Sequence, residues 1–119
     1  MNPGESLHAK AKVLIIDDEE QVRSVLVAIL ETSYDCYTAS SAEGALNSFS
    51  TQTFDLVISD IDMGGMSGIE LTPQLHSISP HTVVLMISGN QDIEIAIEAM
   101  RVGAFDYITK PLDLRHVEA

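Results

Sequence analysis

The chain has 119 residues, 45% of them hydrophobic, and a formal net charge of -12, which suits one compact domain and argues against disorder. Such an acidic surface repels phosphate backbones and acidic membranes, so direct binding of nucleic acid is not expected. The first ten residues contain no apolar signal segment and no stretch reaches the roughly 20 apolar residues of a membrane span, which predicts a cytoplasmic protein without membrane contact.

Short β-branched runs alternate with amphipathic stretches along the chain. Strands are predicted at residues 12–16, 35–39, 54–59, 82–88 and 105–109. Helices are predicted at residues 20–31, from Ser40, after Met66, and at residues 92–102. Near-continuous apolar strands are typical of a parallel sheet that is covered on both faces. The pattern therefore predicts an α/β fold, a doubly wound five-stranded parallel sheet of the flavodoxin-like type with strand order 2-1-3-4-5.

Two helix starts are indicated by local signals. Ser40 followed by Glu43 has the spacing of a capping box, which predicts the start of the second helix. Pro73 lies within the third helical stretch, where a proline removes one backbone hydrogen bond. The third helix is therefore expected either to be kinked or to begin with Thr72 as its cap.

The helix at residues 92–102 is apolar around most of its circumference. One set of apolar residues is expected to face the sheet, namely Ile93, Ala96, Ile97 and Met100. A second set then lies on a flank that the next helix or another molecule must cover, namely Ile95, Ala99 and Val102.

Polar residues follow the carboxyl ends of four predicted strands, where open parallel sheets bind ligands. Asp17 and Asp18 follow the first strand, and Asp60 follows the third. Ser88 ends the fourth strand and Lys110 follows the fifth. Crowded carboxylates repel one another by roughly 4 kcal/mol per pair at ~4 Å and an effective dielectric near 20, so a cation must offset them. Hard oxygen ligands suit Mg²⁺.

These residue types also predict a reaction. With Mg²⁺ and Lys110 stabilising the oxygens of a phosphoryl group, a carboxylate such as Asp60 can attack phosphorus as the nucleophile. The Ser88 hydroxyl can then donate a hydrogen bond to the resulting phosphate. The sequence therefore predicts a magnesium-dependent phosphoacceptor.

Four segments together resemble the receiver domain of two-component response regulators, the family that includes the chemotaxis signalling protein. They are KVLIIDDEE at residues 12–20, DLVISDIDMGGMSGIEL at 55–71, VVLMISG at 83–89 and DIEIAIEAMRVGAFDYITKP at 92–111. The resemblance implies that Asp60 is the phosphoacceptor and that Asp18 ligates the metal directly. It also implies that Asp17 helps to hold the metal, often through water, and that Asp62 contributes its backbone carbonyl.

The resemblance further implies a conformational switch. Ser88 would bond the phosphate, Lys110 would pair with it, and Tyr107 would be the switch aromatic that turns inward, although plain core packing of Tyr107 is the alternative. A cis peptide bond is implied between Lys110 and Pro111. Asp62 and Asn90 are expected to influence the rate of dephosphorylation.

By the same resemblance, the phosphoryl donor would be a sensor histidine kinase or a phosphotransfer protein. The target would be an output domain or a downstream protein, and a homodimer through the fourth helix, last strand and final helix is compatible with this arrangement. The resemblance implies a signalling domain rather than an enzyme with turnover. We expect residues 1–10 to be an N-terminal lead and 11–119 the receiver, a fragment with a truncated final helix, because only eight residues follow Pro111.

Two alternatives remain open at this point. Asp60 to Asp62 after a strand, Ser88 after another and a later lysine also resemble the haloacid-dehalogenase phosphohydrolases. In those enzymes, however, the extra acidic pair follows the lysine, whereas Asp17 and Asp18 precede it here. The other alternative is a receiver-like structural module that is never phosphorylated.

Overall fold

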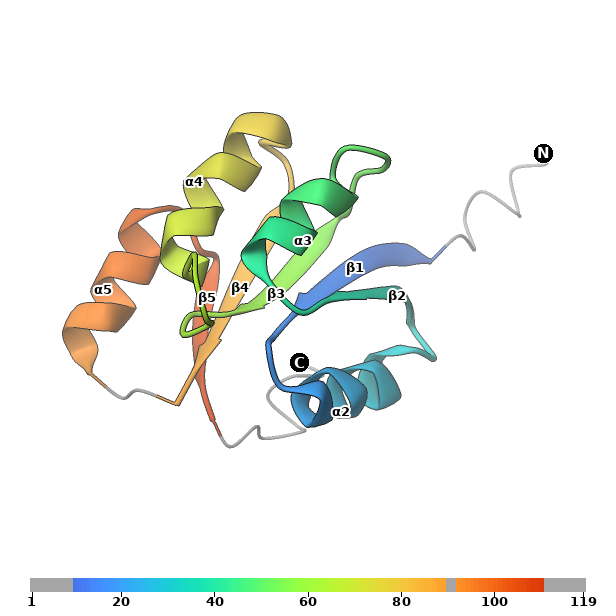
Figure 1. Cartoon of the computed structure of the whole chain (residues 1–119), viewed down its shortest axis with the longest axis horizontal. Helices are drawn as coiled ribbons and strands as arrows, with labels where there is room; N and C mark the ends of the chain where they lie inside the picture. The colour runs from blue at the N-terminus through green and yellow to red at the C-terminus, as the bar shows by residue number, and fades with distance from the viewer. Residues whose placement is uncertain (1–9, 90–91, 111–119) are drawn as a thin grey trace.

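The fold is described by a computed structural model of residues 10–89 and 92–110 (Figure 1). Within these residues, five parallel strands form one sheet in the order β2-β1-β3-β4-β5. The strands are β1 (Ala11–Ile16), β2 (Tyr34–Ala39), β3 (Leu56–Asp60), β4 (Val83–Ser88) and β5 (Asp106–Thr109). The predicted fold class and strand order are therefore confirmed, and each strand lies within two residues of its predicted bounds.

Helices cover both faces of the sheet in the described part of the chain. They are α2 (Glu20–Leu30), α3 (Ala42–Ser48), α4 (Gly68–Ile78) and α5 (Ile93–Arg101). Figure 1 shows α2 on one face of the sheet and α3, α4 and α5 on the other. None of these described helices has the length and apolar character needed to cross a bilayer. The expected final helix after Pro111 and most of the expected N-terminal lead lie outside the described residues.

Alternate residues of the central strands belong to two hydrophobic clusters, because successive side chains of a strand point to opposite faces of the sheet. Leu14 and Ile16 belong to the cluster under α3, α4 and α5, together with Leu71 and Leu75 of α4. The other face is packed by Leu26 and Leu30 of α2 against a second set of strand residues, namely Val13, Ile15, Ile58, Ile87 and Ile108. This two-sided burial explains why the strands are almost continuously apolar.

The helix starts differ in part from those predicted. The cap of α3 is Ser41, whose hydroxyl accepts a hydrogen bond from the Gly44 N–H, so the prediction of Ser40 is wrong by one residue. Helix α4 begins with a complete capping box between Ser67 and Glu70. It continues through Pro73, so the alternative in which Thr72 caps the helix is wrong.

The prediction for the faces of α5 is also wrong. Ala99 is fully buried and packs into the core cluster, with Ile95 and Val102 against its edge. By contrast, Ile93 and Ile97 on the other stripe are 72% and 50% exposed. Both sets of residues follow helical spacing, so hydrophobic periodicity fits either orientation. The small Ala99 side chain allows the helix to pack closely on this side.

A close approach of backbone fixes the connection from β3 to α4. A Cβ placed on Gly68 would lie 2.6 Å from the carbonyl oxygen of Asp60, and 3.1 Å from Ser59 Oγ. The Gly68 N–H donates to the Ile61 carbonyl at 3.0 Å. The start of α4 therefore rests directly on the end of β3, and only glycine fits at this position without a shift of the backbone.

Replacing Gly68 with alanine is expected to lower the free energy of unfolding by about 1–3 kcal/mol, because the new methyl group overlaps a backbone carbonyl that cannot move freely. Gly64→Ala is the matched control in the same loop. A Cβ on Gly64 meets no described heavy atom within 4 Å, so its effect should stay within about 0.5 kcal/mol. Urea denaturation measures both, and equal losses in the two variants would contradict the packing argument.

Candidate functional site

One ammonium group joins three carboxylates at the carboxyl edge of the sheet. Lys110 Nζ lies 3.3 Å from Asp17 Oδ2 and 3.5 Å from Asp60 Oδ2. It also lies 3.4 Å from Glu19 Oε1. Asp17 follows β1, Asp60 ends β3 and Lys110 follows β5, so residues from three separate strands meet at this edge.

Asp17 is buried, and its two carboxylate oxygens differ. Oδ1 accepts a hydrogen bond from the Glu19 N–H at 2.9 Å. Oδ2 is buried and has no hydrogen-bond partner within the described residues; its contact with Lys110 is an ion pair outside hydrogen-bond geometry. A buried carboxylate oxygen without a donor is suited to bind a cation.

The acidic residues here fit a hard metal ion. Asp17, Asp18 and Glu19 each offer a carboxylate oxygen, and these oxygens lie within 4.8 Å of one another. This oxygen-only set suits Mg²⁺, which keeps several waters beside a few carboxylates. The individual ligand roles assigned to Asp17, Asp18, Asp60 and the Asp62 carbonyl remain predictions.

The environment shifts the ionisation of the two central groups. Burial, followed by the charge of Asp17, raises the pKa of Asp60 from 3.8 to about 6, against the opposing effect of Lys110. Burial acts to lower the pKa of Lys110, but the carboxylates of Asp60 and Asp17 outweigh it, so the pKa of Lys110 is raised. Lys110 is therefore a cation at neutral pH, whereas Asp60 is about half ionised near pH 6.

Ser88 lies beside this cluster at the end of β4. Its side chain is fully buried, and its hydroxyl donates to Asp62 Oδ2 over 3.4 Å. The Ser88 carbonyl accepts a hydrogen bond from the Lys110 N–H at 2.8 Å, which fixes the two strand ends to each other. The hydroxyl predicted to bond a phosphate is thus positioned by its neighbours on both sides.

Tyr107 is half-buried in β5, opposite Met86 of β4, and packs against the core cluster under α3, α4 and α5. Its N–H donates to Asp106 Oδ1 at 2.7 Å. This position is compatible with both predicted roles of Tyr107, so its part in a switch stays a prediction. Asn90 and Pro111, including the predicted cis peptide bond, lie outside the described residues.

Sequence reasoning named Asp17, Asp60 and Lys110 but missed Glu19. The signal was present, because Glu19 directly follows the acidic pair in the segment KVLIIDDEE. A glutamate at the start of a helix is ordinarily solvated and interacts favourably with the helix dipole, so its presence there does not by itself predict a contact with the site. Only the structure brings this carboxylate to Lys110, which is 91 residues further along the chain.

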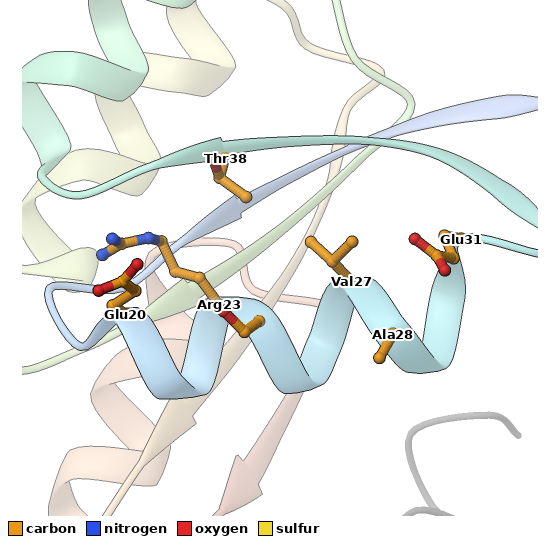
Figure 2. A pocket seen from close by; sticks show the side chains of 7 residues that line it. Glu20, Arg23, Val27, Ala28, Glu31 and Thr38 are labelled. Atoms are coloured by element: carbon orange, nitrogen blue, oxygen red, sulfur yellow. The ribbon is translucent and has the colours of Figure 1, made fainter.

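Surface grooves also occur on α2 and on α5, apart from this acidic cluster. One, of about 390 Å³, runs along α2 beside β2 and is lined by Glu20, Arg23, Ser24, Val27, Ala28, Glu31 and Thr38. Figure 2 shows Arg23 and Val27 on the side of α2 toward β2, with Thr38 across from them. The other, of about 510 Å³, lies on α5 and is lined by Asp92, Glu94, Ile95, Ile97, Glu98 and Arg101.

Comparison with known proteins identifies the family. Residues 13–119 match the response regulator receiver domain, and the chain belongs to this family. The chain is therefore a signalling domain of two-component systems and not one of the haloacid-dehalogenase phosphohydrolases considered above.

Longer proteins that contain a matching region are also response regulators or transcriptional regulators. The transcriptional regulatory protein ZraR of Escherichia coli K12 is 34% identical over 94% of this chain and 26% of its own length. The response regulator protein FleR of Pseudomonas aeruginosa is 38% identical over 88% of the chain and 22% of its length. The DNA-binding transcriptional regulator NtrC of Klebsiella pneumoniae is 36% identical over 84% and 22%, respectively. The chain thus spans about a quarter of these curated relatives.

Among solved structures, a response regulator receiver domain protein from Clostridium thermocellum is 35% identical, with a TM-score of 0.81 over 88% of this chain and 86% of that one. The chemotaxis response regulator CheY4 of Vibrio cholerae is 29% identical, with a TM-score of 0.85 over 92% and 94%, respectively. In both cases the similarity covers most of each chain.

The raised pKa of Asp60 has a consequence for stability. Between the unfolded value of about 3.9 and the folded value of about 6, the folded state binds more protons, so stability falls as pH rises. In EDTA, Asp60→Asn is therefore expected to be more stable than wild type by about 1–2 kcal/mol at neutral pH. The difference should shrink to a few tenths of a kcal/mol near pH 4, where Asp60 is protonated in the folded state and about half protonated in the unfolded state. Urea unfolding at the two pH values measures this, and a less stable variant at neutral pH would show that pairing with Lys110 outweighs burial.

Proposed function

We propose that the chain is a phosphorelay signalling switch in which Asp60 accepts a phosphoryl group from a phosphohistidine of a sensor histidine kinase or phosphotransfer protein, in a reaction that requires Mg²⁺. The observation that carries the proposal is the placement of the Asp60 carboxylate 3.5 Å from the Lys110 ammonium, which also lies 3.3 Å from the buried Oδ2 of Asp17. Membership of the receiver family supports the same function.

In the proposed reaction, an ionised Asp60 oxygen attacks phosphorus and forms a new P–O bond. The bond between phosphorus and the histidine nitrogen breaks, and the ring leaves with that electron pair as a neutral imidazole when its other nitrogen carries a proton. Lys110 pairs with the equatorial oxygens as charge gathers on them. The acidic residues would hold a magnesium ion, and this ion would supply further positive charge to the phosphoryl group.

The response begins with the added charge. An aspartyl phosphate brings about -1.5 to -2 charges and three acceptor oxygens to a site that is otherwise acidic. The Ser88 hydroxyl exchanges its long contact with Asp62 for a phosphate oxygen, and Tyr107 turns into the space that Ser88 leaves. The face formed by α5 and β5 then repacks, and this change is what an output domain or a partner protein detects.

We infer that the chain is the receiver part of a longer cytoplasmic regulator. What supports this is that the curated relatives extend well beyond the matched region and that ZraR and NtrC are named as transcriptional regulators. The output of this protein would accordingly be control of transcription through a separate domain. A receiver-like module that is never phosphorylated is the remaining alternative.

Acetyl phosphate with Mg²⁺ tests the reaction directly. The wild-type chain is expected to gain the mass of one phosphoryl group, whereas Asp60→Asn should gain none because it lacks the nucleophile. EDTA should abolish the gain in the wild type. Intact-mass spectrometry measures all three, and a wild-type chain that stays unmodified would favour the purely structural module.

The exposed apolar residues of α5 suit a phosphorylation-dependent homodimer. Ile93 and Ile97 are 72% and 50% exposed on α5, and Phe105 is 71% exposed just before β5. Ile97→Glu should leave phosphorylation unchanged but weaken self-association of the phosphorylated chain by more than about tenfold, because it places a charge in the interface.

Ile78→Glu is the matched control, because Ile78 is 54% exposed on a different helix, α4. Sedimentation velocity with and without acetyl phosphate gives the dissociation constants. If Ile78→Glu and Ile97→Glu weaken the dimer equally, the interface does not lie on α5.

A further inference from the structure

Glu19 occupies the cap position of α2 but does not cap the helix. The backbone there is extended, with φ -96° and ψ 116°, and the side chain makes no capping hydrogen bond within the described residues. Serine, threonine, aspartate and asparagine are the usual caps because their short side chains reach the first N–H groups. The Glu19 carboxylate instead lies 3.4 Å from Lys110 Nζ, so its contact is with the phosphoacceptor site.

The backbone of Glu19 is held in place by its neighbours. Its N–H donates to Asp17 Oδ1 at 2.9 Å, and its carbonyl accepts from the Arg23 N–H at 3.2 Å. The Arg23 guanidinium also donates to the Asp17 carbonyl at 2.7 Å. These contacts hold the turn between β1 and α2, so the Glu19 backbone is positioned by the same residues that contact Asp17.

The three carboxylates around Lys110 are not equivalent. The side chains of Asp17 and Asp60 are 2% and 4% exposed, whereas that of Glu19 is 63% exposed. All three carboxylates have an oxygen within 3.5 Å of the ammonium, and the contact with Glu19 also has hydrogen-bond geometry. The ammonium is therefore shared between two buried inner acids and one outer acid.

We propose that Glu19 is a positioning residue for Lys110: it gives the ammonium a third, outer partner and so keeps it from pairing with Asp17 and Asp60 alone. This inference rests on the proposed function, because sharing the ammonium with Glu19 limits how far Lys110 neutralises the two inner carboxylates that would meet a cation and the incoming phosphoryl group. An inward ammonium would neutralise the charge that attracts the metal ion.

The effect acts through the position of Lys110 rather than through stability. Exposed ion pairs contribute little to the free energy of unfolding, so Glu19→Gln should fold normally. Without the outer carboxylate, the ammonium has only the two inner acids as partners and shifts toward them. Magnesium affinity then falls for two reasons, the loss of one charge and the inward movement of Lys110.

The first measurement needs neither metal nor phosphate. The chain has three lysines, Lys10, Lys12 and Lys110, so ¹⁵N-lysine labelling gives a simple side-chain NMR spectrum. In EDTA, Glu19→Gln is expected to shift the Nζ signal of Lys110 and to leave the other two unchanged. Glu20→Gln removes the same charge one residue later and should leave the Lys110 signal in place. An unshifted Lys110 signal in Glu19→Gln would overturn the proposal.

The second measurement is magnesium affinity by calorimetry. Glu19→Gln is expected to weaken binding about three- to tenfold more than Glu20→Gln does. In a Lys110→Met background this excess should vanish, because there is no ammonium left to move. Equal losses in the two glutamine variants, or an excess that persists without Lys110, would overturn the proposal and indicate that Glu19 acts on the cation directly.

The two measurements separate this inference from the proposed function. If the wild-type chain binds no magnesium and accepts no phosphoryl group, the proposed function fails, but the NMR signal of Lys110 still reports whether Glu19 holds the ammonium. If phosphorylation proceeds normally but the Lys110 signal is the same in the wild type and in Glu19→Gln, the positioning role alone is wrong.

Discussion

The ion pairs between Lys110 and the buried carboxylates of Asp17 and Asp60 are the constraint on which the rest of the structure depends. Two acids this close, each nearly excluded from water, repel one another strongly unless a cation lies between them. The strand order places β1 beside β3, which brings the acids together, but β4 separates β3 from β5. The long side chain of Lys110 spans the end of β4, so the ammonium reaches both acids from the far strand.

This arrangement ties chemistry to architecture. Every group in the cluster stands at the carboxyl edge because all five described strands are parallel and end on the same side. Gly68 brings the start of α4 directly against the carbonyl of Asp60, so the end of β3 is in close contact with the backbone of α4. The carboxylate that we propose as the nucleophile is therefore held at the end of a strand whose backbone is fixed by these contacts.

The fold and the site could largely be predicted from the sequence because they rest on strong patterns. Continuous apolar runs predict the parallel sheet. The polar residues that follow these runs predict the edge where Asp17, Asp60 and Lys110 meet. The details that failed depend on tertiary packing. Both stripes of α5 are apolar, so only the close fit of Ala99 decides which one is buried. Likewise, neither the crowding at Gly68 nor the reach of Glu19 leaves a periodic signal.

The outer strands of the described sheet carry a further consequence. Exposed Asp35 lies on β2, and exposed Asp106 on β5 bonds the N–H of its neighbour Tyr107. A donor on the rim is thereby occupied by its own chain, and both rims bear negative charge in a molecule that is already strongly acidic. These acids disfavour backbone pairing between copies at both outer strands, so the sheet is protected against growing into an aggregate.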